Sequence, residues 1–387
     1  MAATPFLPFA LPDISEEEIA AVADTLRSGW ITTGKRTKDF EAAFAAATGA
    51  PHAVMLNSCT AALHLALEAI GLRAGDEVVV PTLTFAASAE VVRYFDARPV
   101  LADVRASDHN LAPAAFEAAI TPRTRAVIPV HFAGVPCDMD EIGAIAKARG
   151  IAVIADSAHC FPGEYRGRNV GTLADITCFS FYATKTITTA EGGAAVTANP
   201  EWADRMRIMA LHGISRDAWK RYTAEGSWYY EIVAPGYKYN LTDVASALGL
   251  GQLARAAAMR DRRAAIAAAY DRAFGNLGAF ELLAPPRDRS HAHHLYVVKL
   301  REGALRIGRD ALIERLKERG IGTSVHFIPL HLHPYYRDRY GHSPESLPVA
   351  LDLFRRSISL PIYSRMGDGE VQRVVEAVTA LVAEHRR

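Results

Sequence analysis

Short apolar runs rich in β-branched residues alternate with alanine-rich stretches between about residue 53 and residue 200. Strands separated by helices are joined by right-handed crossovers, so this pattern predicts an α/β fold with one large, mostly parallel sheet. The runs with the length and character of buried strands are EVVVP (77–81), RAVIPV (125–130), IAVIAD (151–156), DITCFSF (175–181) and GAAVTA (193–198).

The second half of the chain changes pattern. Residues 201–213 predict a helix that stops at a glycine, and residues 241–275 predict a helix that begins at Thr242 or Asp243 and is long enough to link two domains. Beyond it, a small α+β unit is predicted from a strand (293–300), a helix (309–320), a strand (323–329) and a helical pattern from Gly367 onward.

The length of the chain also indicates two domains. We expect a large domain over residues 1–250 and a small C-terminal domain over residues 251–387. Between the two patterns, residues 214–240 have weak periodicity but contain five tyrosines and two tryptophans, a composition that argues against disorder. Loops of this length are often functional, so we expect an ordered excursion here.

Composition narrows the class of protein. The chain has 387 residues, and 43 Lys and Arg balance 43 Asp and Glu, whereas nucleic acid and anionic membranes select a basic excess. No apolar run is long enough to span a membrane, and the N-terminus lacks the basic start of a targeting peptide. The four scattered cysteines argue against a disulfide framework and a zinc site. We expect a cytoplasmic protein, and a local basic pocket for a phosphorylated small molecule remains compatible with the zero net charge.

Two residues are candidates for chemistry. Asp156 ends the run 151–156, and ligands of parallel sheets bind outside the carboxyl ends of strands. Lys185 follows another strand, and an amine buried there loses hydration, so its pKa falls and it becomes nucleophilic at neutral pH. Simpler interpretations are that Asp156 caps the next turn and that Lys185 is a surface lysine. The spacing of both, with Ser180 and a Gly-Gly pair nearby, favours a lysine that binds a carbonyl compound.

This combination resembles the fold-type I enzymes that use pyridoxal phosphate, and more narrowly the sugar-nucleotide aminotransferases of the DegT/DnrJ/StrS group. The matching motifs keep the order of the family and span nearly the whole chain. They are SGWITTGKRTKDFE, NSCTAALHLAL, GDEVVVPTLTF, DSAHC, SFYATKTITTAEGG, HGISRDAW, PGYKYNLTDVASALGLGQL and VHFIPLH. The resemblance implies a seven-stranded sheet in a large domain, a smaller C-terminal domain, and a homodimer with shared active sites.

The resemblance also implies a role for each matching residue. Lys185 would bind the cofactor aldehyde, Asp156 would keep the ring nitrogen protonated, and His159 would contact the ring oxygen or the ring face. Phe85 would stack on the ring, although a core position is an alternative. The cofactor phosphate would lie at the start of a helix, where backbone N–H groups are free. Its expected ligands are Cys59, Thr60, Ala61 and Ser180.

The segment GYKYN (236–240) departs from the common pattern G-x-N-x-R of the family. In relatives this segment reaches the cofactor phosphate of the neighbouring subunit, and Lys238 and Asn240 would do so here. The candidates for binding the sugar nucleotide are Trp30, Thr33, Arg216, Trp219, Lys220, Arg221, Tyr222, Trp228 and His326.

The implied reaction moves an amino group, with L-glutamate as the expected donor, to the C4 keto group of a sugar linked to UDP or dTDP. Pyridoxamine phosphate would carry the amino group in the second half-reaction. GYKYN and HGISRDAW are closest to enzymes that make UDP-4-amino-4-deoxy-L-arabinose, but those usually have tryptophan where Phe85 stands, so the sugar is left open.

Three alternatives compete with this function. They are amination at C3, a dehydration on the same fold, and a regulator that binds the cofactor or a sugar nucleotide without catalysis. In the dehydratase branch a histidine occupies the lysine position, so Lys185 argues against dehydration, and a regulator has no need of both Asp156 and Lys185.

Two other patterns have weaker functional interpretations. The histidines at 291, 293, 294, 326, 331 and 333 lack the spacing and the carboxylates of a metal site, so no metal is expected. The G-x-G of ALGLGQ lies inside a helical pattern after no strand, so it does not predict dinucleotide binding.

Overall fold

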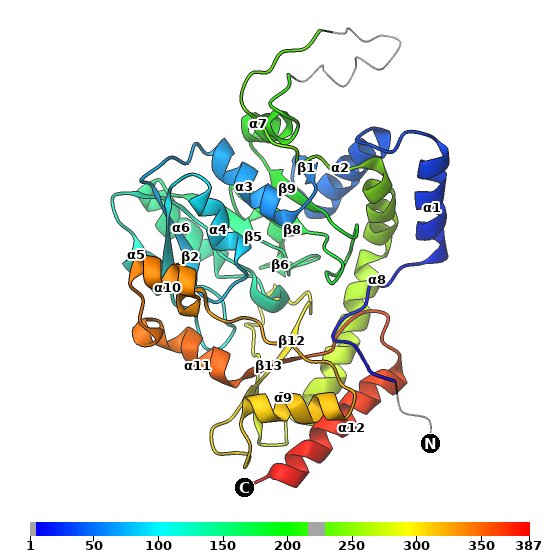
Figure 1. Cartoon of the computed structure of the whole chain (residues 1–387), viewed down its shortest axis with the longest axis vertical. Coiled ribbons are helices and arrows are strands. Elements are labelled where there is room, and N and C mark those ends of the chain that lie inside the picture. Colours follow the sequence, from blue (N-terminus) through cyan, green and yellow to red (C-terminus); the bar gives the residue numbers. More distant parts are fainter. Residues whose placement is uncertain (1–4, 216–228) are drawn as a thin grey trace.

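The computed structural model describes residues 5–215 and 229–387, and a seven-stranded sheet lies at its centre (Figure 1). The strand order is β1-β9-β8-β5-β4-β2-β3, and only β9 runs antiparallel to its neighbours. The predicted α/β fold with a mostly parallel sheet is therefore confirmed. The strands are β1 (His52–Leu56), β2 (Glu77–Pro81), β3 (Arg98–Ala102), β4 (Thr124–Val127), β5 (Ala152–Asp156), β8 (Ile176–Ser180) and β9 (Gly193–Thr197).

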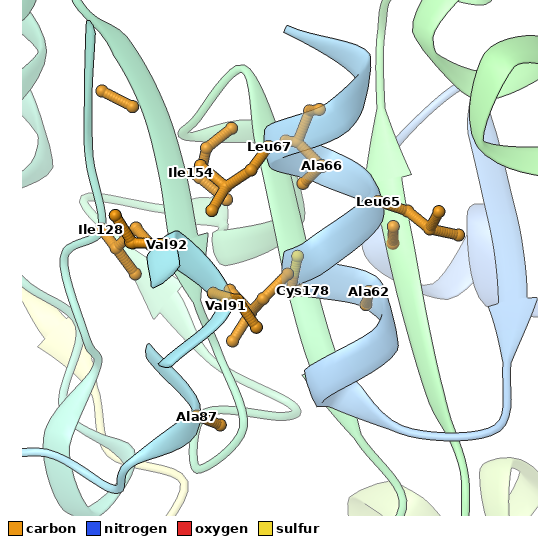
Figure 2. Close-up of a cluster of buried hydrophobic side chains, with 14 of the residues drawn as sticks. Ala62, Leu65, Ala66, Leu67, Ala87, Val91, Val92, Ile128, Ile154 and Cys178 are labelled. Carbon is orange, nitrogen blue, oxygen red and sulfur yellow. The ribbon is translucent and has the colours of Figure 1, made fainter. Parts of the chain in front are cut away.

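Helices cover both faces of this sheet, because successive strand residues point to opposite sides and both sides are apolar. Val78 and Val80 of β2 belong to a core with α3 (Cys59–Ala69), α4 (Ala87–Arg93) and α7 (Pro200–Ala210). Val79 belongs to a second core with α5 (Pro113–Ala119) and α6 (Met139–Arg149). Figure 2 shows part of the first core, where side chains of α3 and α4 lie against Ile128, Ile154 and Cys178.

The long helix α8 (Asp243–Phe274) confirms the prediction for residues 241–275, with Thr242 as its N-cap. Its first half packs beside α1 (Glu16–Arg27) and α2 (Lys35–Thr48). Its second half joins a separate apolar core with the C-terminal elements, and Figure 1 shows it running toward α9 and α12. The G-x-G pair lies inside this helix, as expected.

The C-terminal part is built on a three-stranded antiparallel sheet of β10 (Phe280–Leu282), β12 (Tyr296–Leu300) and β13 (Ser357–Leu360). The helices around it are α9 (Arg309–Glu318), α10 (Pro334–Tyr340), α11 (Pro348–Arg356) and α12 (Asp368–His385). A small sheet of β11 (Arg289–Ser290), β6 (Glu164–Tyr165) and β7 (Arg168–Asn169) connects this part with the large one. The exact domain boundary at residue 250 stays a prediction.

One predicted strand is wrong. Residues 323–329 form no ladder and pair with β13 at a single bridge, between Ser324 and Ser359. Pro329 ends the run without an N–H to donate, and the strand that completes the sheet is β13, which the apolar pattern did not single out.

The remaining short elements are 3₁₀ turns at Phe132–Gly134, Val170–Thr172, Leu330–Leu332 and Pro344–Ser346. Among the residues that the structure describes, none of the helices combines the length and the apolar character that crossing a bilayer requires.

Candidate active site

Asp156 is the last residue of β5 and is buried beneath the carboxyl edge of the sheet. Its Oδ2 accepts a hydrogen bond of 2.8 Å from Ser88 Oγ, and its Oδ1 accepts one of 3.0 Å from the N–H of Ala158. Burial raises the pKa of this carboxyl, while the hydrogen bond from Ser88, that from Ala158 and the charge of Lys185 oppose the rise. The bond from Ala158 means that Asp156 does cap the next turn, as the simpler interpretation held. A cap requires neither a buried side chain nor the second hydrogen bond that Oδ2 accepts from Ser88.

Lys185 lies in the turn after β8, and its backbone N–H donates to the carbonyl of Tyr182. Its side chain is partly buried and forms no ion pair with any residue in the ranges 5–215 and 229–387. Burial lowers the pKa of this amine to about 8, while the charge of Asp156 acts in the opposite direction. A lysine with this pKa is partly neutral, and therefore nucleophilic, near neutral pH. The burial of the amine argues against the interpretation of Lys185 as an ordinary surface residue.

The N-terminus of α3 faces the same edge of the sheet. Ser58 caps the helix by accepting a hydrogen bond of 3.0 Å from the N–H of Ala61. Within the described ranges the N–H groups of Cys59 and Thr60 have no protein acceptor, as the first turn of a helix leaves them. The side chain of Cys59 turns inward, where its Sγ lies 4.0 Å from Oδ1 of Asp156.

Gly193 allows this helix end to come close to the sheet. A Cβ at this position would lie 2.4 Å from the backbone nitrogen of Cys59, so any larger residue would displace α3. Gly193 pairs with Ser180 across the β8–β9 ladder. Ser180 therefore lies next to Gly193, the strand residue that touches the start of α3. This position suits a phosphate bound by both Ser180 and the helix N-terminus.

His159 and Phe85 line another side of the site. His159 is buried, and its ring stacks on Phe327 with 5.9 Å between the ring centroids. Its Nδ1 is buried and has no hydrogen-bond partner among the described residues, and burial lowers its pKa well below the ordinary value. Phe85 is 63% exposed and contacts Phe327 at 6.2 Å between centroids, so the alternative of a core position is wrong.

A third group of predicted residues is joined by hydrogen bonds. Lys238 Nζ donates to Oδ1 of Asn240, whose Nδ2 donates to Thr33 Oγ1 at 2.6 Å. Trp30 joins this group through a bond of 3.2 Å from its Nε1 to the carbonyl of Thr33. The backbone of Asn57, two residues before Cys59, donates to the carbonyl of Tyr239 at 2.7 Å. These contacts place the segment 236–240 beside the start of α3.

The histidines of the C-terminal part have separate roles. His326 Nδ1 pairs with Ser359 Oγ at 2.8 Å, and burial lowers its pKa to about 4. His331 is buried between Thr82 and the carbonyl of Pro344. In the part of the chain that the structure describes, no three His, Cys, Asp or Glu residues are grouped as metal ligands. The expected residues Arg216, Trp219, Lys220, Arg221, Tyr222 and Trp228 lie outside the described residues.

Comparison with known proteins matches residues 12–379 to the DegT/DnrJ/EryC1/StrS aminotransferase family. The chain belongs to this family. It is 47% identical to the spore coat polysaccharide biosynthesis protein SpsC of Bacillus subtilis, and the match covers 97% of each chain. It is 49% identical to protein MJ1066 of Methanocaldococcus jannaschii, and this match covers 98% of this chain and 99% of that one.

Solved structures of relatives identify the cofactor. Spr1654 of Streptococcus pneumoniae, assigned as a sugar aminotransferase, superposes with a TM-score of 0.92 at 38% identity in its PMP form, covering 98% of this chain and 99% of that one. Its PLP form gives a TM-score of 0.90 at 37% identity over the same shares. The protein is accordingly a sugar aminotransferase that depends on pyridoxal phosphate.

The residues of this aminotransferase fit the cofactor. The free N–H groups at the start of α3 suit a phosphate, the buried carboxylate of Asp156 suits a protonated ring nitrogen, and the amine of Lys185 suits an aldehyde. The orphaned Nδ1 of His159 shows that the wall of the site retains hydrogen-bonding capacity.

Sequence reasoning missed several residues of this aminotransferase that the fold brings to the site. Ser88 and Thr84 are buried and hydrogen-bonded to each other behind Asp156. Phe327 and His294 contact His159 from the C-terminal part. Thr84 belongs to the motif around Phe85, and Ser88 follows that motif directly. A serine four residues after a threonine does not by itself indicate a functional site.

Proposed function

We propose that the enzyme transfers an amino group from L-glutamate to the C4 keto group of a ketosugar linked to UDP or dTDP. The observation that carries the proposal is the pairing, at one edge of the sheet, of a buried carboxylate (Asp156) with an amine of lowered pKa (Lys185). The motifs GYKYN and HGISRDAW support the C4 position through their resemblance to enzymes of that specificity.

Bound at this site, pyridoxal phosphate supplies an aldehyde that combines with amines and a ring that withdraws electrons. With the cofactor bound, Lys185 would act as the general base that takes the proton from the α-carbon of glutamate, and as the acid that gives this proton back. Lys185 performs the same transfers in the reverse direction when the ketosugar is aminated. Its pKa of about 8 suits both tasks, because the amine is close to the pH at which it must give and take protons.

Asp156 holds the proton at the ring nitrogen. A carboxylate at this position would favour the charged, protonated form of the ring nitrogen, and a protonated ring would supply the electron withdrawal that the proton transfer by Lys185 needs. The hydrogen bonds from Ser88 and from the N–H of Ala158 stabilise the ionised carboxylate and oppose the rise of its pKa that burial causes.

The other predicted residues position the cofactor and the sugar. The N–H groups of Cys59 and Thr60 and the hydroxyl of Ser180 bind the phosphate, whereas the N–H of Ala61 is already taken by Ser58. His159 and Phe85, which both lie against Phe327, contact the ring of the cofactor. Trp30, Thr33 and His326 are proposed to contact the sugar nucleotide, and Arg216, Lys220 and Tyr222 are proposed from the sequence alone.

We also place two copies of the chain in the active enzyme. Lys238 is exposed. Ile232 and Val233, which precede it in the chain, are exposed apolar residues on the segment that pairs with residues 213–215. A partner subunit that covers these residues would bring the phosphate of the cofactor bound to the partner close to Lys238.

Mixing two inactive variants tests this arrangement. If Lys238 serves the neighbouring site, dimers of Lys185→Ala and Lys238→Ala subunits contain one intact site in two, and random pairing restores about a quarter of the wild-type rate. If Lys238 serves its own subunit, mixing restores nothing.

A substrate panel tests the function. Glutamate should convert the visible spectrum of the purified enzyme to that of the pyridoxamine form, and a regulator that only binds the cofactor would show no conversion. The pyridoxamine form is then offered nucleotide 4-ketosugars and 3-ketosugars, and return of the original spectrum identifies the acceptor. A return with 3-ketosugars alone would replace the C4 assignment by C3.

A further inference from the structure

His294 lies against His159 at the inner wall of the site. The ring centroids are 4.4 Å apart and the planes are tilted by 40°. Both side chains are more than nine-tenths buried, and the Nδ1 atom of each is buried without a hydrogen-bond partner among the described residues. Two adjacent imidazoles, each with an unsatisfied nitrogen, are an unusual pair, because buried polar atoms are normally bonded.

Other histidines of the C-terminal part are satisfied elsewhere. His326 pairs with Ser359, His331 with Thr82 and Pro344, and His291 accepts a bond of 2.7 Å from the N–H of His293. His294 therefore differs from its neighbours in having its nitrogen free at the catalytic wall.

The backbone of His294 is held from two directions. Its N–H donates to the carbonyl of Ala133 at 3.0 Å, which anchors it to the large part of the molecule. Arg263 of α8 is buried, and its Nη1 donates to the carbonyl of His294 at 3.4 Å and to that of Ile362 at 2.8 Å. The ring of His294 thus contacts His159 from a fixed backbone position.

Both imidazoles are neutral at physiological pH. Burial is the main cause that lowers each pKa well below the ordinary value, and the nearby charges of Lys185 and His326 act in the same direction on both, as does that of Arg263 on His294. A neutral imidazole has one N–H donor and one acceptor nitrogen, so two neutral rings in contact are complementary.

We propose that His294 is a positioning residue whose Nδ1–H donates to Nδ1 of His159 and so keeps the proton of His159 on Nε2. His159 is then a hydrogen-bond donor toward the ring oxygen of the cofactor, rather than an acceptor that would repel it. The inference rests on the proposed role of His159. It gives the C-terminal part of the chain direct control over which tautomer the large domain presents.

Three single variants test the inference. His294→Phe keeps the ring but removes the nitrogen, His294→Asn restores an N–H near the position of Nδ1, and His293→Asn is the control. His293 is the preceding histidine, stacks on His291 at 4.2 Å, and has a positive φ that asparagine tolerates. The readouts are the dissociation constant of pyridoxal phosphate from the cofactor-free protein, the rate of the glutamate half-reaction and the melting temperature.

We expect His294→Phe to weaken cofactor binding and to slow the half-reaction by about 3- to 10-fold, the range for one neutral hydrogen bond. His294→Asn should recover most of this loss, and His293→Asn should match the wild type. In a His159→Phe background, His294→Phe should change neither quantity by more than about twofold, because a residue that acts through His159 has nothing left to position.

Several results would overturn the inference. Equal losses in the wild-type and His159→Phe backgrounds would show that His294 acts independently, and a loss in His293→Asn as large as that in His294→Phe would show a general packing effect. If His159→Phe weakens cofactor binding and slows the half-reaction while His294→Phe behaves like the wild type, the role of His294 is refuted and that of His159 stands. A normal His159→Phe would remove the assigned role of His159 as well.

Discussion

Ser88 Oγ donates a hydrogen bond of 2.8 Å to Oδ2 of Asp156, although the two residues are 68 positions apart and lie on α4 and β5. Both side chains are buried, and Ser88 Oγ also lies 2.8 Å from Thr84 Oγ1. Burial alone would favour a neutral carboxyl at position 156. Ser88 therefore helps to keep ionised the carboxylate that the proposed chemistry requires.

Removing this donor should weaken catalysis without removing the cofactor. Ser88→Ala leaves Oδ2 of Asp156 without its partner and raises the pKa of that carboxyl further. Hydrogen bonds to charged groups contribute about 1.5–3 kcal/mol, so the rate of the glutamate half-reaction should fall by about 10- to 100-fold. Stopped-flow absorbance measures it, and an unchanged rate together with an unchanged melting temperature would show that Ser88 is dispensable.

Asp156→Asn should have a larger effect. A neutral amide keeps the size of the side chain but cannot hold the proton at the ring nitrogen, so pyridoxal phosphate still binds while proton transfer by Lys185 slows by at least about 100-fold. Binding is measured by visible absorbance and proton transfer by the exchange of the α-hydrogen of glutamate in deuterated water. Full exchange activity in this variant would refute the assigned role of Asp156.

Lys185→Ala should abolish both turnover and the visible absorbance of the bound cofactor. Borohydride reduction of the wild-type enzyme should leave a pyridoxyl group on the peptide 179–196, detected by mass spectrometry. Lys147→Ala, which removes an exposed lysine on α6, should retain the adduct and full activity. An adduct on another peptide would move the site away from Lys185.

The uptake of cofactor by the cofactor-free protein should depend on pH. The folded-state pKa of Lys185 is about 8, below the ordinary value of 10.5, and only the neutral amine attacks an aldehyde. The rate of uptake should therefore rise with pH and level off above a midpoint near 8. A midpoint near 10.5, measured by stopped-flow absorbance, would show that the amine is not buried in solution.

Gly193→Ala should disturb the start of α3. Its Cβ would lie 2.4 Å from the backbone nitrogen of Cys59, so helix and strand must separate, at a cost of about 1–3 kcal/mol, with weaker cofactor binding as a consequence. Gly143→Ala on α6 is the matched control, since a Cβ there meets nothing within 4 Å and should slightly stabilise the helix. Thermal unfolding and a cofactor titration distinguish the two variants.

Local pattern predicted five of the seven strands of the sheet, whereas β1 and β3 were not singled out, and it made Asp156 and Lys185 candidates for chemistry. Apolar runs bounded by turns predict strands, and the rule that ligands bind beyond the carboxyl ends of parallel strands drew attention to Asp156 and Lys185. Their combined spacing and the resemblance to the family were needed to prefer them over a turn cap and a surface lysine. The long helix α8 was equally readable, because a 32-residue helical pattern with an N-cap has no competing interpretation.

The predicted strand at 323–329 was wrong for a physical reason. A β-prone run becomes a strand only where a neighbouring edge offers hydrogen bonds in register, and here a single bridge joins Ser324 to Ser359. Whether Phe85 lies in the core or in the site was likewise undecided by its neighbours in sequence, because exposure depends on what the rest of the chain covers.

The sequence by itself determined the fold class and the family, and it made Lys185 and Asp156 the candidates for chemistry, since these depend on periodicity and on short motifs. Only the tertiary structure decided that Ser88 supports Asp156 and that His294 contacts His159. Serine and histidine acquire such roles from burial and from partners far apart in the chain. The local sequence around Ser88 and His294 encodes neither the burial of the side chain nor the identity of its distant partner.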